Sequence, residues 1–543
     1  MYTPIGPRIR IAAICAALAV LVAMVLLLVR PGLDPARIRP LPLLILAWLA
    51  FLFAAWLLRS VTVKVAVALI LAGGVAVQVA AVSAPPQNSN DLYRYIWDGN
   101  VQAAGIDAYA YVPASRALED LRNNFLWYPG AEYCVGPSAT RAGGCTRINR
   151  PTVPTIYPPV AEAYFLGVHY LPDASDSSTP IQSTTAGIAV LTTLLLLFGL
   201  RRLGSDIRMA AFWSWCPTVA LEAGNSAHVD VVAVAITLVA LLLLATARTR
   251  FRTAIGGVLF GLAVATKMTP VLAGPALLRR RWITVAVSAA SAFSVVYIPH
   301  LIAVGSKVIG FLPGYLKQEG YENGSRFGII SLVAGGHAAI VIAVAVLGVT
   351  GLLVLRFSDP DRPWRGAVVM TAAALAVATP HYQWYALLLV MLVALDGRPE
   401  WLAFAAGGYY ATEPNMGRLT VPSRYHDAVA YGVPVLVVAA GWAWRASRSR
   451  HARPIPVPAL TPSGSPDLTP ALTPSGSQAL TPSGSIAQLT RSSGLNYVID
   501  PMGDDPMGGV PMEVVPMGGD PSAAVIAAEE HAISAPPLRS ILN

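Results

Sequence analysis

The chain has few charged residues and very few cysteines. Asp, Glu, Lys and Arg make up 12% of its 543 residues, 4 residues are cysteine, and 55% are hydrophobic. Soluble globular domains carry about 25% charged residues, so this composition excludes an ordinary soluble protein. The mean hydropathy of +0.57 places the chain among polytopic membrane proteins.

The chain also lacks the short motifs of nucleotide-driven and serine-dependent chemistry. It contains no Walker loop, no Gly-x-Gly-x-x-Gly before a helix and no Gly-x-Ser-x-Gly. These motifs cradle phosphates or present a nucleophilic serine, so their absence argues against an ATP-driven pump and a soluble hydrolase. The net charge of +9 does not indicate a nucleic-acid partner, because the basic residues lie in short loops between apolar runs, where they set orientation.

Long apolar runs dominate the rest of the chain. They predict an all-α polytopic membrane protein, a bundle of about 12–14 transmembrane or half-depth helices embedded in the lipid bilayer. The expected elements are 11–29, 41–58, 61–84, 182–200, 207–223, 229–247, 253–265, 270–278, 283–303, 328–355, 366–379, 383–396, 400–412 and 428–444. The first run is longer than the apolar core of a signal peptide, and another run follows it closely, so we interpret it as a retained helix.

The arginines indicate the orientation. With the N-terminus in the cytoplasm, most arginine clusters between the runs fall inside, as the positive-inside rule requires. Only the 30–40 loop, with Arg30, Arg37 and Arg39, departs from this pattern. We therefore expect both termini in the cytoplasm and a large polar insert outside it.

Four regions follow from this topology. We expect N-terminal transmembrane helices (1–84), a large first outer loop (85–181), a transmembrane core (182–450) and a cytoplasmic tail (451–543). The tail repeats ALTPSGS three times, and then Pro-Met-Gly three times. Pro, Gly and Ser at this density bury too little apolar surface to offset the entropy of ordering, so the tail is predicted to be disordered.

The insert opens with residues 90–99 (NDLYRYIWDG), in which Asp91 and Asp98 lie about two helical turns apart on one face. Tyr93 and Arg94 lie between them. A carboxylate just past a membrane helix can take a proton from an acceptor hydroxyl. The alternatives are that both carboxylates are solvated, or that Asp91 only caps the following helix.

Other polar residues are predicted on the same membrane face. Glu222, Asn225, His228 and Asp230 lie at a helix junction, where they can line a cavity mouth. His228 with the two acidic residues can also be interpreted as a metal site, but the spacing matches no established metal motif, so we expect no metal or other cofactor.

Three cations on that face can bind a phosphate, namely Lys267, Arg326 and His381. The short runs 253–265 and 270–278 are expected to form a hairpin with Lys267 at its tip. Interrupted membrane segments of this kind usually border a cavity. For each cation, contact with lipid head groups is the alternative. Outside the cytoplasm, Cys134 and Cys145 would form a disulfide that rigidifies the insert.

In these motifs the chain resembles the bacterial GT-C glycosyltransferases, and within them the polyprenyl-phosphomannose-dependent mannosyltransferases. The resemblance rests on residues 90–99, 105–109 (GIDAY), 155–159 (TIYPP), 222–230 (EAGNSAHVD), 261–270 (GLAVATKMTP) and 380–381 (PH). Ala108 stands where the family usually has Pro, which leaves the aspartate assignment intact. The matching motifs span most of residues 85–445 and exclude the tail.

The resemblance implies an inverting transferase of the bacterial plasma membrane. It would move a sugar, mannose first among the options, from a polyprenyl monophosphate to a glycolipid, lipoglycan or other glycan acceptor on the outer face. Asp91 would be the general base, with Asp98 or Asp107 as a second acidic residue, and Lys267, His381 and Arg326 would hold the donor phosphate. We also expect Tyr93, Arg94, Tyr157 and the 222–230 cluster to contact substrate.

Two other functions remain open at this point. A transporter or flippase of a lipid-linked or anionic substrate would also use intramembrane charges and broken helices. It would not need a large outer insert that begins with an aspartate. A non-catalytic scaffold is the third possibility.

Overall fold

The structure, a computed structural model, describes residues 6–30, 40–128, 145–412 and 423–451. In this part of the chain the regular structure is helical except for one two-stranded sheet. The expected disordered tail and Cys134 lie outside the described residues. The fold is that of an all-α polytopic membrane protein, as the apolar runs predict.

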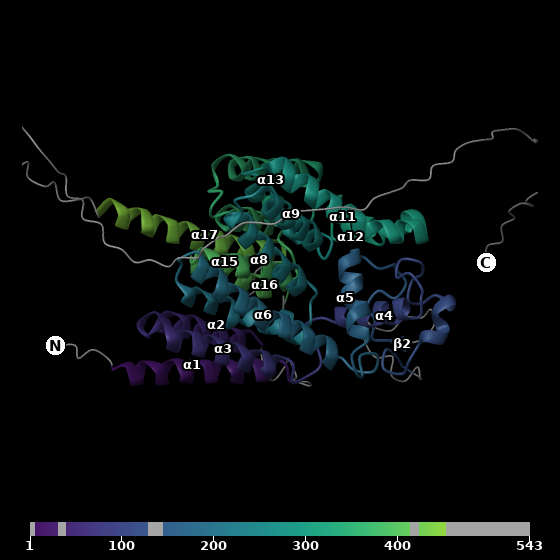
Figure 1. Cartoon of the computed structure of the whole chain (residues 1–543), viewed down its shortest axis with the longest axis horizontal. Helices are drawn as coiled ribbons and strands as arrows, with labels where there is room; N and C mark the ends of the chain where they lie inside the picture. Colours follow the sequence, from purple (N-terminus) through teal and green to yellow (C-terminus); the bar gives the residue numbers. More distant parts are fainter. Residues whose placement is uncertain (1–5, 31–39, 129–144, 413–422, 452–543) are drawn as a thin grey trace, which may run out of the picture. The chain divides into compact units, whose positions relative to one another are not determined.

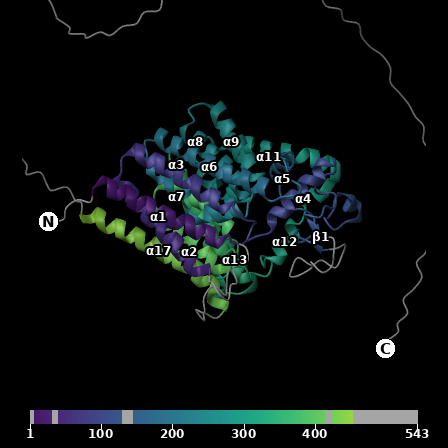
Figure 2. The ribbon, with the colours of Figure 1, turned by 90° about the horizontal axis from the view of Figure 1, so that it is seen from below.

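The N-terminal half supplies three membrane helices, the insert and the start of the core. Its elements are α1 (Pro7–Leu28), α2 (Pro40–Leu57), α3 (Val63–Ala81), α4 (Asp91–Ala103), β1 (Trp127–Tyr128), β2 (Cys145–Thr146), α5 (Pro159–His169), α6 (Thr179–Arg202), α7 (Ala211–Ser214) and α8 (Asp230–Thr246). Helix α1 packs along α2 and α3 (Figure 1). Figure 2 shows α4 beside α5, away from α1 and α2.

The C-terminal half alternates long helices with short ones. Its elements are α9 (Arg250–Val264), α10 (Gly274–Leu277), α11 (Trp282–Val304), α12 (Leu312–Gln318), α13 (Gly336–Phe357), α14 (Trp364–Ala378), α15 (Leu387–Asp396), α16 (Ala403–Thr412) and α17 (Ser423–His451).

Seven helices in the described residues are long and apolar enough to cross a membrane. They begin at Pro7, Pro40, Val63, Thr179, Trp282, Gly336 and Tyr425. An eighth span is formed if α8 and the π-helical turn before it, Val219–Asn225, count as one segment, which is bent by 115°. The expected element 207–223 is divided into short pieces, because a 3₁₀ turn, α7 and the π-helical turn follow one another there.

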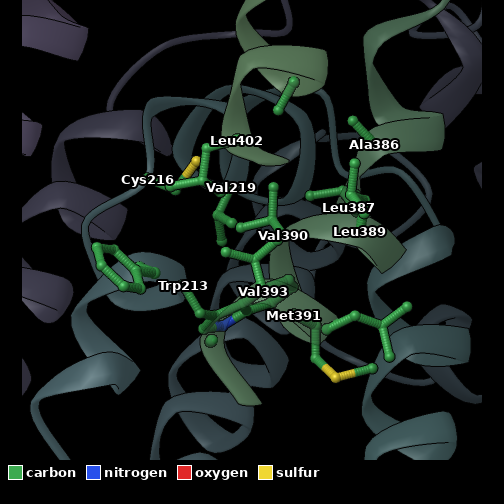
Figure 3. Close-up of a cluster of buried hydrophobic side chains, with 14 of the residues drawn as sticks. Trp213, Cys216, Val219, Ala386, Leu387, Leu389, Val390, Met391, Val393 and Leu402 are labelled. Atoms are coloured by element: carbon green, nitrogen blue, oxygen red, sulfur yellow. The ribbon is translucent and has the colours of Figure 1, made fainter. Parts of the chain in front are cut away.

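Helix α15 forms the centre of the core and does not face lipid. All nine of its residues from Leu387 to Leu395 are buried, among side chains such as Trp213, Cys216 and Val219 (Figure 3). A helix that is apolar on all sides is stable only when protein surrounds it. The apolar run 383–396 is therefore a core helix of 10 residues, too short to span a bilayer alone.

Close helix packing around α9 depends on glycine. Gly257 and Gly261 face α11, and a Cβ at Gly261 would collide with the backbone of Ala289. Small residues four apart let membrane helices approach closely. This contact fixes α9, whose C-terminal end leads directly to Lys267.

We predict that Gly261→Ala destabilises the protein by about 1–3 kcal/mol, because the added methyl group overpacks the α9–α11 contact. Thermal unfolding in detergent measures the effect as a lower Tm. Gly348→Ala in α13 is the matched control, since a Cβ there meets nothing within 4 Å. Equal Tm values for the two variants would contradict the assigned contact.

Candidate active site

Asp91 is the first residue of α4, and its two carboxylate oxygens face different neighbours. Oδ1 accepts a hydrogen bond from the side-chain amide of Asn149, whereas Oδ2 lies 3.8 Å from Nδ1 of His228. The helix start favours a negative charge here through its dipole. The side chain is 19% exposed, so it is held by the protein and still reachable by a ligand.

The π-helical turn Val219–Asn225 and the residues after it supply the opposite wall. Glu222 projects from this turn and accepts hydrogen bonds from Tyr409 and Asn88 on one oxygen. Its other oxygen lies 3.6 Å from Nε2 of His228. His228 therefore lies buried between two carboxylates, and neither of its ring nitrogens forms a hydrogen bond with the described residues. π-Helical turns are rare and are frequently found at functional sites.

Lys267 lies in the same cluster. It follows the C-terminal end of α9, and its Nζ is 3.0 Å from Oδ2 of Asp230, the first residue of α8. The ammonium group also lies 5.3 Å from the centre of the Tyr157 ring. The interrupted backbone that suggested a cavity thus places a cation, 16% exposed, beside the Asp91 cluster.

Aromatic rings connect these groups to the neighbouring loops. Trp384 stacks on His228 with ring centres 3.8 Å apart, and Tyr382 stacks on Trp384 at 4.7 Å. Tyr157 meets Tyr95 edge to face at 4.9 Å. Flat aromatic faces suit the apolar face of a sugar ring.

Arg326, predicted to bind phosphate, lies in a second cluster centred on Glu319. Glu319 pairs with Arg326 at 3.1 Å and with Arg150 at 3.8 Å, and it accepts a hydrogen bond of 2.8 Å from the Tyr382 hydroxyl. Tyr382 and the Trp384 ring stacked on it lead from this cluster to His228.

His381, the third predicted phosphate ligand, is 48% exposed and pairs with Asp427 at 2.9 Å. Lys267, Arg326 and His381 are thus all paired with a carboxylate. Pairing is expected for cations in partly apolar surroundings, because a lone buried charge is costly.

Asp98 lies apart from Asp91. Its carboxylate forms two hydrogen bonds with Nε of Arg94, at 2.9 and 3.1 Å, and both side chains are buried. Arg94 also donates to the carbonyl of Val153. This arrangement favours a role in holding the insert together, and the catalytic assignment of Asp98 stays untested.

Glu162 of α5 completes this buried cluster. It accepts hydrogen bonds from Thr155 at 2.8 Å and from Gln102 at 2.9 Å. Burial, and then the negative charge of Asp98, raise the pKa of the Glu162 carboxyl well above its usual value. Asp98 differs from Glu162 in that it pairs directly with Arg94, whose positive charge opposes the effect of burial on the pKa of Asp98.

The remaining predicted residues have structural contacts. The Asn225 amide bonds to the backbone of Ala81, Ala84, Pro85 and Gln87. Tyr93 is buried against Phe125. Cys145 is disulfide-bonded, but its expected partner Cys134 lies outside the described residues, so that pairing stays a prediction. The substrate contacts expected for Asn225, Tyr93 and Arg94 also stay predictions.

The sequence assigned no role to five residues of the site, namely Asn149, Arg150, Glu162, Glu319 and Trp384, although it placed Glu319 and Trp384 in loops on the same membrane face as Asp91. Most come from loops whose positions depend on distant contacts. For Asp98, by contrast, the sequence contains a local indication of its partner. Arg94 and Asp98 lie four residues apart, a spacing that favours an ion pair on one face of a helix. Among the described residues, no group of three or more His, Cys, Asp or Glu side chains is placed to hold a metal ion.

Residues 155–380 match the family model described as Glycosyltransferase family 87. The match supports a membrane glycosyltransferase and does not favour transport. It includes Tyr157, the 222–230 cluster, Lys267 and Arg326, whereas Asp91 lies before it and His381 directly after it. No curated protein matches the chain, and no solved structure does.

The raised pKa of Glu162 predicts a pH-dependent stability. The carboxyl binds its proton more tightly in the folded state than in the unfolded chain, where its pKa is about 4.5. Stability from this group is therefore complete below about pH 4.5 and is lost as the pH rises through the folded pKa. In Glu162→Gln the side chain keeps its size and shape but can no longer lose a proton. The Tm of this variant should therefore fall less than that of the wild type as the pH is raised.

Thermal unfolding across this pH range measures the difference. Glu119→Gln is the control, because Glu119 is exposed in the same insert and its substitution should leave the wild-type slope unchanged. Parallel slopes for wild type and Glu162→Gln would contradict the buried-proton assignment.

Proposed function

We propose that this protein is an inverting glycosyltransferase that moves a sugar, mannose as the first candidate, from a polyprenyl monophosphate to a hydroxyl of a glycolipid, lipoglycan or other glycan. The observation that carries the proposal is a group of five side chains, in which His228 lies between Asp91 and Glu222 and Lys267 pairs with Asp230. The two sets interact through charge, Lys267 with His228 and Asp91 with Asp230. The group combines a reachable carboxylate with a cation, and the family match independently indicates glycosyl transfer.

The chemistry needs two charges of opposite sign. The acceptor oxygen attacks the anomeric carbon as its proton passes to the Asp91 carboxylate. The bond from that carbon to the phosphate oxygen breaks on the opposite face, and the polyprenyl phosphate leaves with the electron pair. A positioned base and a cation beside the leaving oxygens lower the barrier for these two changes.

Lys267 is the best-placed donor-phosphate ligand of the three predicted cations. It is the one that belongs to the Asp91 cluster, and its pairing with Asp230 fixes the ammonium group before substrate arrives. An incoming phosphate would share Lys267 with Asp230. Arg326 is less accessible to a phosphate, because its side chain is buried and paired with Glu319.

The lipid part of the donor fits the same architecture. Helices α11 and α13 expose large apolar side chains along their length, among them Val295, Ile302 and Val344. Such faces contact acyl or polyprenyl chains at no desolvation cost. We place the site on the extracytoplasmic face of a bacterial plasma membrane, with both termini in the cytoplasm, residues 85–181 as the catalytic loop and residues 182–450 as the transferase core.

We predict that Asp91→Asn lowers transfer about 10²–10⁴-fold, the usual contribution of a general base. Purified protein is assayed for release of polyprenyl phosphate from radiolabelled polyprenyl-phosphomannose with a membrane-extracted acceptor. Asp120→Asn is the matched control, because Asp120 is an exposed aspartate of the same insert. Full activity of a folded Asp91→Asn variant would remove Asp91 from the role of base.

Substitution of Lys267 tests the phosphate contact separately. Lys267→Met should lower kcat/KM for the donor about 10–100-fold, since a charge-assisted hydrogen bond contributes about 1.5–3 kcal/mol. The double variant Lys267→Met/Asp230→Asn removes the buried charge that the single change leaves unpaired, and it should show the same defect. Lys64→Met, at an exposed lysine in α3, is the control. Wild-type kcat/KM in the folded double variant would assign the phosphate to other cations.

A further inference from the structure

We propose that Asn149 is a positioning residue for Asp91, which holds Oδ1 and leaves Oδ2 as the atom that receives the acceptor proton. This inference rests on the proposed function and adds to it a residue that lies outside the matched segment 155–380. It begins from the unequal surroundings of the two carboxylate oxygens.

The two oxygens differ in whether a donor already occupies them. The Asn149 amide nitrogen donates to Oδ1. Among the described residues, no side chain donates a hydrogen bond to Oδ2, since Nδ1 of His228, at 3.8 Å, is beyond hydrogen-bond distance. A base needs a free lone pair within reach of the hydroxyl it deprotonates, and Oδ2 provides it.

The chain just before Asn149 is packed into the insert. The preceding residue, Ile148, is fully buried in the core of the insert, and its backbone N–H donates to the Thr146 hydroxyl. That hydroxyl donates to the carbonyl of Leu126 at 2.7 Å, next to the β1–β2 pair. The packed part of the insert therefore sets the position from which the Asn149 amide contacts Asp91.

The residue after Asn149 adds a backbone constraint. Arg150 has a φ of 47°, in the left-handed region that costs a non-glycine residue about 1 kcal/mol or more. Its side chain pairs with Glu319 at 3.8 Å, and its carbonyl accepts from the Val153 N–H. The chain turns sharply here, directly after the amide that contacts Asp91.

An amide at this position restricts the carboxylate without adding charge. A carboxylate in its place would share one proton with Asp91, because two adjacent carboxylates do not ionise independently. The other titratable and charged groups that face or interact with Asp91 are Tyr95, Tyr157, His228, Asp230 and Arg150. They are the same in wild type and variants, so a change in the pH profile reports on position 149.

Asn149→Asp and Asn149→Ala test the inference with the polyprenyl-phosphomannose transfer assay. For Asn149→Asp, the acid limb of the pH profile of kcat/KM should move up by about one pH unit or more. For Asn149→Ala, kcat should fall about 10–100-fold with the donor KM within about twofold, because the base loses orientation while the phosphate ligand is intact.

The control distinguishes positioning from folding. Asn123 is an amide of the same insert that bonds to Ser175 and to the backbone N–H of Leu126, so Asn123→Ala should lower the Tm and leave the acid limb in place. An unmoved acid limb in an active Asn149→Asp protein, or full kcat in Asn149→Ala, would overturn the inference alone. No transfer by the wild type from any polyprenyl-phosphate sugar would overturn the proposed function and this inference together.

Discussion

Pairing of opposite charges in apolar surroundings is the constraint on which this structure depends. Asp230 is the first residue of α8, whereas Lys267 lies in the loop that follows the end of α9, and the two side chains pair at 3.0 Å. Neither charge is tolerable alone inside a membrane protein. Their pairing therefore holds the loop after α9 against the start of α8. His228 and Glu222, which lie just before α8 in the chain, face Asp91 there.

The insert follows the same constraint at a second place. Arg94, Asp98 and Glu162 place two carboxyl groups and one guanidinium group together in the buried part of the insert, where burial and Asp98 raise the pKa of Glu162. They join α4 to α5 and to the loop that ends at Tyr157. Since α4 begins with Asp91, the geometry of the proposed base depends on this buried cluster.

Much of the fold could be predicted from the sequence, because a long apolar run can satisfy its backbone hydrogen bonds in a membrane in few ways other than as a helix. The short runs on either side of Lys267 also indicated a broken segment, and the structure has one there. The run 383–396 was misleading, since its residues are as apolar as those of a span. Only the surrounding protein distinguishes α15 from a lipid-facing helix.

The site was less predictable for a physical reason. Asp91 and Asp98 lie seven residues apart, which suggested a joint role, but the Arg94–Asp98 spacing gives Asp98 a nearer partner. Asn149 and Arg150 reach Asp91 and Glu319 through a loop fixed by β1–β2 pairing and by Ile148, contacts between residues about 20 apart in the chain. No local pattern encodes such distances.

The burial of α15 has a consequence for biosynthesis. Even with the 3₁₀ turn before it, the apolar stretch Gln383–Asp396 rises only about 23 Å, against roughly 30 Å of hydrocarbon. The insertion machinery selects segments by their length and hydrophobicity, so this stretch is a poor candidate to enter the membrane by itself. Its place in the molecule therefore depends on the helices that pack around it, among them α7, α8 and α14.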